Sequence, residues 1–150
     1  MVQPFQSVSK GLYVAQKFDD ETVERLVKLT EDLDIPNALE PHDFHTTILY
    51  SDRWVPYVLE RKEVRLNDSG RGRVTTWVNH KGVKIAVLTF ESEYLQERHD
   101  YGRALGATHG FDTFDPHVTL SYDCGPLEFD QEVEIDLVGK KEYSEVLDTE

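Results

Sequence analysis

Apolar and polar positions along this chain follow two different periods. Residues 11–18 and 83–90 form runs of strand length, and residues 43–50 and 115–122 alternate between apolar and polar side chains. Alternation with a period of two predicts strands that turn one face toward a core. Between the members of each pair, the pattern changes to helical spacing, at Val23, Leu26, Val27 and Thr30 in one segment and at Leu95, His99, Gly102 and Leu105 in the other. Each half of the chain is therefore predicted to read strand, helix, strand.

The second half repeats the first half 72 residues later. The segment DFHTTILY at 43–50 matches DPHVTLSY at 115–122, and GLYVAQKF at 11–18 matches VKIAVLTF at 83–90. A further strand-like run closes each half, at 63–66 and at 132–138. Acidic and small polar residues stand where a helix N-terminus prefers them, at Asp19 and at Ser92. We expect a duplicated α+β unit, over roughly 11–66 and 83–138, within a single compact domain of residues 1–150.

Composition predicts a soluble protein in a reducing compartment. Hydrophobic residues make up 39% of the 150 residues and charged residues 30%, which is typical of a globular domain. The chain contains no apolar run near the ~20 residues that span a bilayer, and its start lacks the pattern of a secretion signal. We therefore expect a cytoplasmic location and no membrane partner. Cys124 is the single cysteine, so an intramolecular disulfide is excluded.

The formal net charge of −13 restricts the class of ligand. Proteins that bind long nucleic acids rely on many Lys and Arg contacts to phosphates, so we expect no long nucleic-acid partner. A small anionic ligand needs only a few local positive charges, for which the candidates are Lys10, Lys17, Lys81, Lys84, Arg71 and Arg73. The segment 67–73, NDSGRGR, is predicted to be a loop, either a solvated hairpin or a flap over a cleft.

The two repeated motifs carry the candidate chemistry. Each contains His-x-Thr, with His45 and Thr47 in one copy and His117 and Thr119 in the other. Because strand side chains alternate, each His points to the same side as its Thr. Two imidazoles and two hydroxyls in one cleft suit metal-free phosphoryl transfer, in which one imidazole removes a proton and the other supplies one. These four residues are the predicted catalytic set.

A zinc site is the main competing interpretation of the same residues. His42, Asp43, His45 and His117 supply imidazoles and a carboxylate. Two His three apart on an extended segment point to opposite faces, and no His-Glu-x-x-His is present. We therefore predict no metal and no cofactor. A binding module without chemistry is the other alternative.

With the HTT motif at 45–47 and the HVT motif at 117–119, the chain resembles the two-histidine (2H) phosphoesterase superfamily. The length, the segments GLYVAQKF and FHTTILYS and the closing EYSEVLD most resemble the phage anti-CBASS phosphodiesterases within it. The resemblance implies a bilobal α+β fold, with two pseudo-symmetric strand-helix-strand lobes and antiparallel sheets around a central cleft. It also implies a metal-independent hydrolase of cyclic di- and trinucleotide messengers such as cyclic GMP-AMP, acting in the bacterial host cytoplasm against CBASS defence.

The resemblance further implies which residues contact the bases. Its aromatic residue on the first strand, its mid-chain Trp and its acidic residue near the C-terminus are best matched by Tyr13, Trp77 and Glu145, with Glu142 close to the last position. Three functions remain open. The protein could cleave cyclic oligonucleotides, or it could act on RNA with 2′,3′-cyclic phosphate ends or 2′-5′ linkages. The third is sequestration of a nucleotide without turnover. The oligomeric state is left open as well.

Two tyrosines follow the motifs at equal distance. Tyr50 and Tyr122 each lie three residues beyond the Thr of their motif. An odd spacing in a regular strand places a side chain on the opposite face. We therefore expect both tyrosines to pack in the core or against the other lobe, away from the catalytic side chains.

Overall fold

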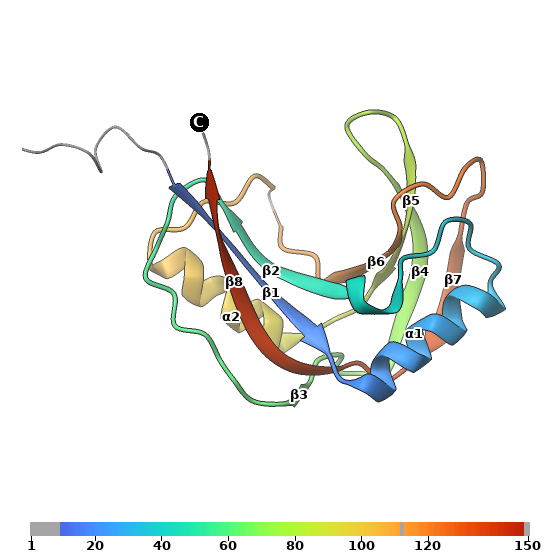
Figure 1. Ribbon diagram of the computed structural model, residues 1–150, viewed down its shortest axis with the longest axis horizontal. Coiled ribbons are helices and arrows are strands. Elements are labelled where there is room, and N and C mark those ends of the chain that lie inside the picture. The colour runs from blue at the N-terminus through green and yellow to red at the C-terminus, as the bar shows by residue number, and fades with distance from the viewer. Residues whose placement is uncertain (1–9, 112, 149–150) are drawn as a thin grey trace, which may run out of the picture.

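The computed structural model describes residues 10–111 and 113–148, and the chain there forms strands and helices (Figure 1). The strands are β1 (Lys10–Phe18), β2 (His45–Ser51), β3 (Val64–Arg65), β4 (Arg71–Val78), β5 (Lys84–Thr89), β6 (His117–Ser121), β7 (Asp130–Glu134) and β8 (Val138–Asp148). The helices are α1 (Asp20–Asp32), the short 3-10 helix η2 (Pro41–Asp43) and α2 (Glu93–Ala104). The α+β fold class predicted from the periodicity is confirmed.

All strands pair antiparallel in one continuous sheet. The spatial order is β3-β8-β1-β2-β6-β5-β4-β7, so the sheet divides into a first group that ends in β2 and a second group that begins with β6. The groups meet where Thr46 of β2 pairs with Val118 of β6. Figure 1 shows the two groups diverging from this seam, with α2 beside the first group and α1 beside the second. We call the two groups lobe 1 and lobe 2.

Both helices begin where the sequence indicated. The Asp19 side chain accepts a hydrogen bond from the Thr22 backbone N–H, and the Ser92 side chain accepts one from Leu95 N–H. These contacts satisfy backbone donors that have no partner inside the helix. The predicted N-terminal signals are confirmed.

The helix of the second half packs against strands of the first half. Nδ1 of His99 on α2 lies 2.8 Å from the Ile48 carbonyl oxygen on β2. At Gly102 a Cβ atom would come within 2.9 Å of the Leu49 side chain, so the glycine lets α2 approach β2 without displacing Leu49. The helix therefore crosses from lobe 2 to lobe 1, a connection that the repeat along the chain did not reveal.

The strand predicted at 132–138 is wrong in its extent. Residues 130–134 form β7 at the edge of lobe 2, and β8 begins in lobe 1 at Val138. The buried Asn67 side chain bonds the backbone between them, donating to Ile135 O at 2.6 Å and accepting from Leu137 N at 3.0 Å. The Asn67 amide takes the place of a neighbouring strand here. It satisfies the backbone C=O of Ile135 and the backbone N–H of Leu137 where the chain crosses from lobe 2 to lobe 1.

The predicted loop at 67–73 is also shorter than expected. β4 begins at Arg71, and both Arg71 and Arg73 pair in register with β7. The Arg73 guanidinium lies 2.6 Å from the Asp130 carboxylate. Arg71 and Gly72 pair with β7 and Arg73 pairs with both β7 and β5, so this end of the segment is strand and not flap.

Candidate active site

The two His-x-Thr motifs occupy the two strands that meet at the centre of the sheet. His45 and Thr47 are half-buried, whereas Thr46 between them is fully buried. The same alternation holds on β6, where Val118 is buried between half-buried His117 and Thr119. Each histidine therefore shares a sheet face with its own threonine, and that face is turned away from the core.

Both imidazoles are held by the same backbone contact. Nδ1 of His45 lies 2.8 Å from the Asp43 carbonyl oxygen, and Nδ1 of His117 lies 2.8 Å from the Asp115 carbonyl oxygen. Because a carbonyl can only accept, Nδ1 carries the proton in both rings. The neutral ring then presents Nε2 as an acceptor, and the protonated ring presents it as a donor.

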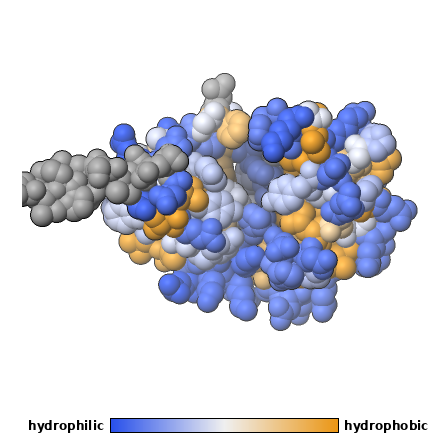
Figure 2. All heavy atoms as spheres, turned by 45° about the horizontal axis from the view of Figure 1, so that its top comes forward, coloured by the Kyte–Doolittle hydropathy of each residue, from blue (hydrophilic) through white to orange (hydrophobic). Residues whose placement is uncertain are grey.

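The seam between the lobes brings the motifs side by side. Thr46 pairs with Val118, and the Thr46 hydroxyl donates a hydrogen bond of 2.8 Å to the His117 carbonyl oxygen. Since β2 and β6 run antiparallel, the two motifs are related by an approximate two-fold axis through this pair. His45 is close enough to His117 to lower its pKa electrostatically. Figure 2 shows the surface hollowed between the two lobes.

Tyr13 of β1 is bound to the first motif. Its hydroxyl and the Thr47 hydroxyl share a hydrogen bond of 2.9 Å, and its ring stands edge-on to His45 with centroids 6.4 Å apart. Burial raises the pKa of Tyr13, so the phenol stays protonated near neutral pH. The predicted substrate-contacting tyrosine therefore also orients a predicted catalytic hydroxyl.

Trp77 of β4 covers the second motif. Its ring meets the His117 ring edge-on, with centroids 4.6 Å apart. Burial lowers the pKa of His117 because it disfavours the charged imidazolium. His117 is thus biased toward the neutral ring at neutral pH.

Comparison with known proteins identifies the family. The family model described as anti-CBASS protein Acb1 matches residues 10–150. The anti-CBASS protein Acb1 of Enterobacteria phage T4 is 45% identical over 95% of this chain and 92% of its own length. The Acb1 of Salmonella phage S16 is 43% identical over the same shares of both chains. The chain belongs to the Acb1 family.

Solved structures support the fold of this Acb1-family chain. A crystal structure of E. coli LigT complexed with phosphate matches with a TM-score of 0.53 and 11% identity, over 93% of this chain and 95% of LigT. A crystal structure of a phosphoesterase matches with a TM-score of 0.54 and 11% identity, over 90% of this chain and 86% of that one. At such low identity the likeness concerns the fold alone. The predicted 2H phosphoesterase-like fold and the resemblance to phage anti-CBASS proteins are confirmed.

The structure separates the two acidic candidates near the C-terminus. Glu145 is exposed on β8 and pairs in register with Tyr13, so it lies on the face of the motifs. Glu142 is buried, and its carboxylate accepts hydrogen bonds from Arg98 at 2.8 and 3.0 Å and from Glu60 N at 2.8 Å. Glu142 therefore fastens α2 to β8, and of the two only Glu145 is available to a ligand.

The expectation that Tyr50 and Tyr122 pack in the core is wrong. Their side chains are 62% and 57% exposed. The pairing register slips by one residue after Thr47 on β2 and after Thr119 on β6, which is the mark of a β-bulge. The extra residue restores each tyrosine to the face of the histidines, and the Tyr50 ring lies 6.0 Å from that of Tyr13.

One aromatic residue of this face had no signal in the sequence. Tyr143 of β8 pairs in register with Ala15, and its ring lies 6.3 Å from Tyr13. Burial raises the pKa of Tyr143. Only the sheet order could have placed it here, because β8 and β1 are neighbours in space and far apart in the chain.

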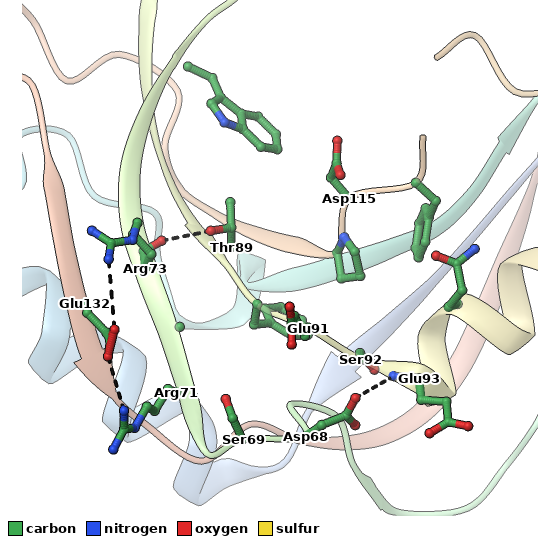
Figure 3. Close-up of a pocket in the computed structure, with 16 residues that line it drawn as sticks. Asp68, Ser69, Arg71, Arg73, Thr89, Glu91, Ser92, Glu93, Asp115 and Glu132 are labelled. Atoms are coloured by element: carbon green, nitrogen blue, oxygen red, sulfur yellow. Dashed lines mark hydrogen bonds and ion pairs between the residues drawn. The ribbon is translucent and has the colours of Figure 1, made fainter. Parts of the chain in front are cut away.

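A cavity of about 970 Å³ adjoins the second motif (Figure 3). Its lining includes Trp77, Thr89 and Pro116, which flank His117, together with Arg71 and Arg73. Figure 3 shows both arginines directed at the Glu132 carboxylate between them. The histidines themselves are not among its lining residues, so the cavity is an extension beside the motifs.

The alternative zinc site finds no ligand set in the described residues. Within 10–111 and 113–148 no three His, Cys, Asp or Glu side chains are grouped so that they could hold a metal ion. His42 lies 3.5 Å from the Asp43 carboxylate, and both are exposed.

Among residues 10–111 and 113–148, no helix has the length and apolar character needed to cross a membrane.

Proposed function

We propose that this protein is a metal-independent phosphodiesterase that opens cyclic di- and trinucleotides at a 3′-5′ phosphodiester, and that it counters CBASS defence in the host cytoplasm. The observation that carries the proposal is the matched pair of imidazoles, each with Nδ1 on a backbone carbonyl and Nε2 free for proton transfer. Membership of the Acb1 family supports the anti-CBASS role. His45, Thr47, His117 and Thr119 are the proposed catalytic residues.

The reaction needs one neutral and one protonated histidine. Nε2 of the neutral ring takes the proton of a ribose 2′-hydroxyl, and O2′ attacks the adjacent phosphorus. The P–O5′ bond breaks as the other ring gives its proton to O5′, which leaves a 2′,3′-cyclic phosphate. Water then opens this ring with the two roles exchanged. Burial lowers the pKa of His117, which favours His117 as the neutral ring of the pair.

The threonine hydroxyls stabilise charge that develops on the phosphate. A donor aimed at a non-bridging oxygen acts most strongly when that oxygen gains charge in the transition state. The Tyr13 hydroxyl can donate to Thr47 across their 2.9 Å contact, which leaves the Thr47 proton for the phosphate. Tyr13 therefore supports the first motif as a positioning residue in addition to any contact with a base.

Base recognition is assigned to three residues. Trp77 and Tyr13 offer aromatic surfaces beside the histidines, and stacking on such surfaces contributes about 1–3 kcal/mol per base. The exposed Glu145 carboxylate can accept hydrogen bonds from a guanine edge. The cavity beside Trp77 has room for a part of the ligand beyond the scissile phosphate.

The test is a product analysis with EDTA present. The purified protein is incubated with cyclic GMP-AMP, a cyclic trinucleotide, a 2′-5′ oligoadenylate and an RNA ending in a 2′,3′-cyclic phosphate. Cleavage of the cyclic oligonucleotides is expected. Cleavage of the RNA end or the 2′-5′ bond alone would move the activity to RNA processing, and binding without cleavage would indicate sequestration.

Variants connect the activity to the motifs. We expect His45→Gln and His117→Gln each to lower kcat by about 10²–10⁴-fold, because each removes one proton-transfer group. His80→Gln is the matched control, since His80 is exposed in the β4–β5 hairpin. Equal activity of the motif variants and the control would refute the assignment.

A further inference from the structure

Lys17 of β1 lies beside the first motif. It pairs in register with His45, and side chains of paired residues project from the same face of a sheet. Lys17 is half-buried, while its neighbours Gln16 and Phe18 are buried on the opposite face. The ammonium Nζ lies 5.8 Å from the centroid of the Tyr143 ring. Lys17 is therefore a cation on the face that carries the histidines.

The charge of Lys17 is not neutralised by a carboxylate among the described residues. Its hydrogen-bond partner is the His42 carbonyl oxygen, at 2.8 Å. Several other cations of this acidic chain do have acidic partners, for example Arg73 with Asp130 at 2.6 Å and Lys84 with Glu128 at 3.2 Å. An ammonium has three donors, so two remain after the contact with His42.

The charge of Lys17 has no counterpart in the second half of the repeat. The residue 72 positions after Lys17 is Thr89, which pairs with His117 as Lys17 pairs with His45. The Thr89 hydroxyl donates to the Arg73 carbonyl oxygen at 3.3 Å. Beyond Thr89 the next strand carries the neutralised Arg73, whereas beyond Lys17 it carries the exposed Lys141. Uncompensated positive charge thus lies on the His45 side of an otherwise matched pair.

We infer that Lys17 is a further substrate-binding and catalytic residue, whose ammonium contacts a non-bridging oxygen of the scissile phosphate on the His45 side. This inference rests on the proposed function. The protonated imidazole gives its proton to O5′ during the step, and the threonines supply only neutral donors, yet the pentacoordinate phosphate carries more negative charge than the substrate. A fixed ammonium stabilises that added charge, and removing one such donor typically costs about 10²–10³-fold in kcat.

A structural role for Lys17 predicts a different result. Because its ammonium holds the carbonyl of His42, the side chain also ties η2 to β1 just before His45. Lys17→Gln keeps a donor for a backbone carbonyl and removes the charge, and Lys17→Arg keeps the charge. Lys28→Met is the matched control, since Lys28 has the same charge and lies exposed on α1 beside Asp32.

Two measurements test the inference. The first is the affinity for inorganic phosphate, followed by the amide shifts in an NMR titration. The second is kcat for cyclic GMP-AMP, with thermal unfolding recorded for every variant. We expect Lys17→Gln to weaken phosphate binding at least about tenfold and to lower kcat about 10²-fold, with Lys17→Arg in between and Lys28→Met unchanged. A structural role would instead lower the unfolding temperature and leave the phosphate affinity of the folded protein unchanged.

The outcomes separate this inference from the proposed function. If Lys17→Gln is folded, binds phosphate and cleaves cyclic GMP-AMP like the wild type, the inference is overturned and the proposed function stands. If the wild type binds phosphate through Lys17 but cleaves no cyclic oligonucleotide, the phosphate site stands and the proposed function fails. A wild-type protein without measurable phosphate binding also contradicts the inference.

Discussion

Single residues decide how the two imidazoles are presented. His45 and His117 are each held at Nδ1 by the carbonyl of the aspartate two positions before. The sequence shows the shared Asp-x-His spacing, but it does not show which group of the aspartate contacts the ring. In the structure the backbone carbonyl takes this role, because the chain enters each strand with that carbonyl turned toward the ring. The consequence is a ring of fixed tautomer with Nε2 exposed to a ligand.

The environment of His117 predicts its titration. Burial lowers the pKa of His117, so its midpoint in an NMR pH titration should fall below the ordinary value of about 6.5. Trp77→Ala exposes the ring and should move the midpoint up toward that value. His117→Gln identifies the resonance. A wild-type midpoint above about 6.5 would contradict the predicted effect of burial.

The lowered pKa of His117 also makes the stability of the fold depend on pH. The native state binds fewer protons at His117 than the unfolded state does, so stability falls as the pH drops below about 6.5. His99 adds to this effect, because burial between α2 and β2 also lowers its pKa. Above the ordinary histidine pKa neither group contributes a pH dependence.

At the scale of elements, two β-bulges shape the face of the site. Regular alternation after Thr47 and Thr119 would have buried Tyr50 and Tyr122, whereas the register slips in β2 and β6 expose both. A bulge is a property of the pairing between two strands, and a single strand sequence does not encode it strongly. This is why a correct prediction of the strands still produced a wrong prediction for the tyrosines.

A buried ion pair adds to the attachment of α2 to lobe 1. Arg98 of α2 donates two hydrogen bonds to Glu142 of β8, whose side chain is fully buried. Hydrogen bonding to this carboxylate raises the pKa of Arg98. We expect Arg98→Met to lower the free energy of unfolding by about 3–5 kcal/mol, because it leaves a buried charge without its partner.

Urea denaturation measures this loss. Arg103→Met is the control, since Arg103 is exposed on the same helix and should change the free energy of unfolding by no more than about 0.5 kcal/mol. A loss for Arg98→Met as small as that of the control would mean that Glu142 finds another partner or reaches water.

At the scale of the whole molecule, the distribution of charge favours a compact anionic ligand over a long polyanion. The chain carries a net charge of −13, and in the described residues the arginines of β4 are paired with carboxylates of β7. Beside His45, the pairing of β1 with β2 and β8 places Lys17 and Lys141, for which the described residues show no ion pair. Such a surface can hold one phosphate, but it opposes the many simultaneous contacts of a polyanion.

Competition with RNA tests this view. We expect tRNA in about tenfold excess over cyclic GMP-AMP to leave the rate of cleavage unchanged at low salt, where polyanion binding is strongest. A non-hydrolysable cyclic dinucleotide at the same excess is the positive control and should inhibit. Inhibition by tRNA that disappears as salt is added would indicate a basic surface that the net charge conceals.

The sequence by itself determined most of the local structure and indicated the candidate chemistry. Periodicity predicted the strands and helices, capping residues marked the helix starts, and the repeated His-x-Thr identified four candidate residues, since all of these depend on neighbours in the chain. The tertiary structure decided what depends on distant neighbours. The order β8-β1-β2-β6 brought Tyr143 and Lys17 to the first motif, and pairing of β4 with β5 set Trp77 on His117. It also assigned Glu142 to an ion pair and left Glu145 exposed, because burial of a strand face is set by what packs on it.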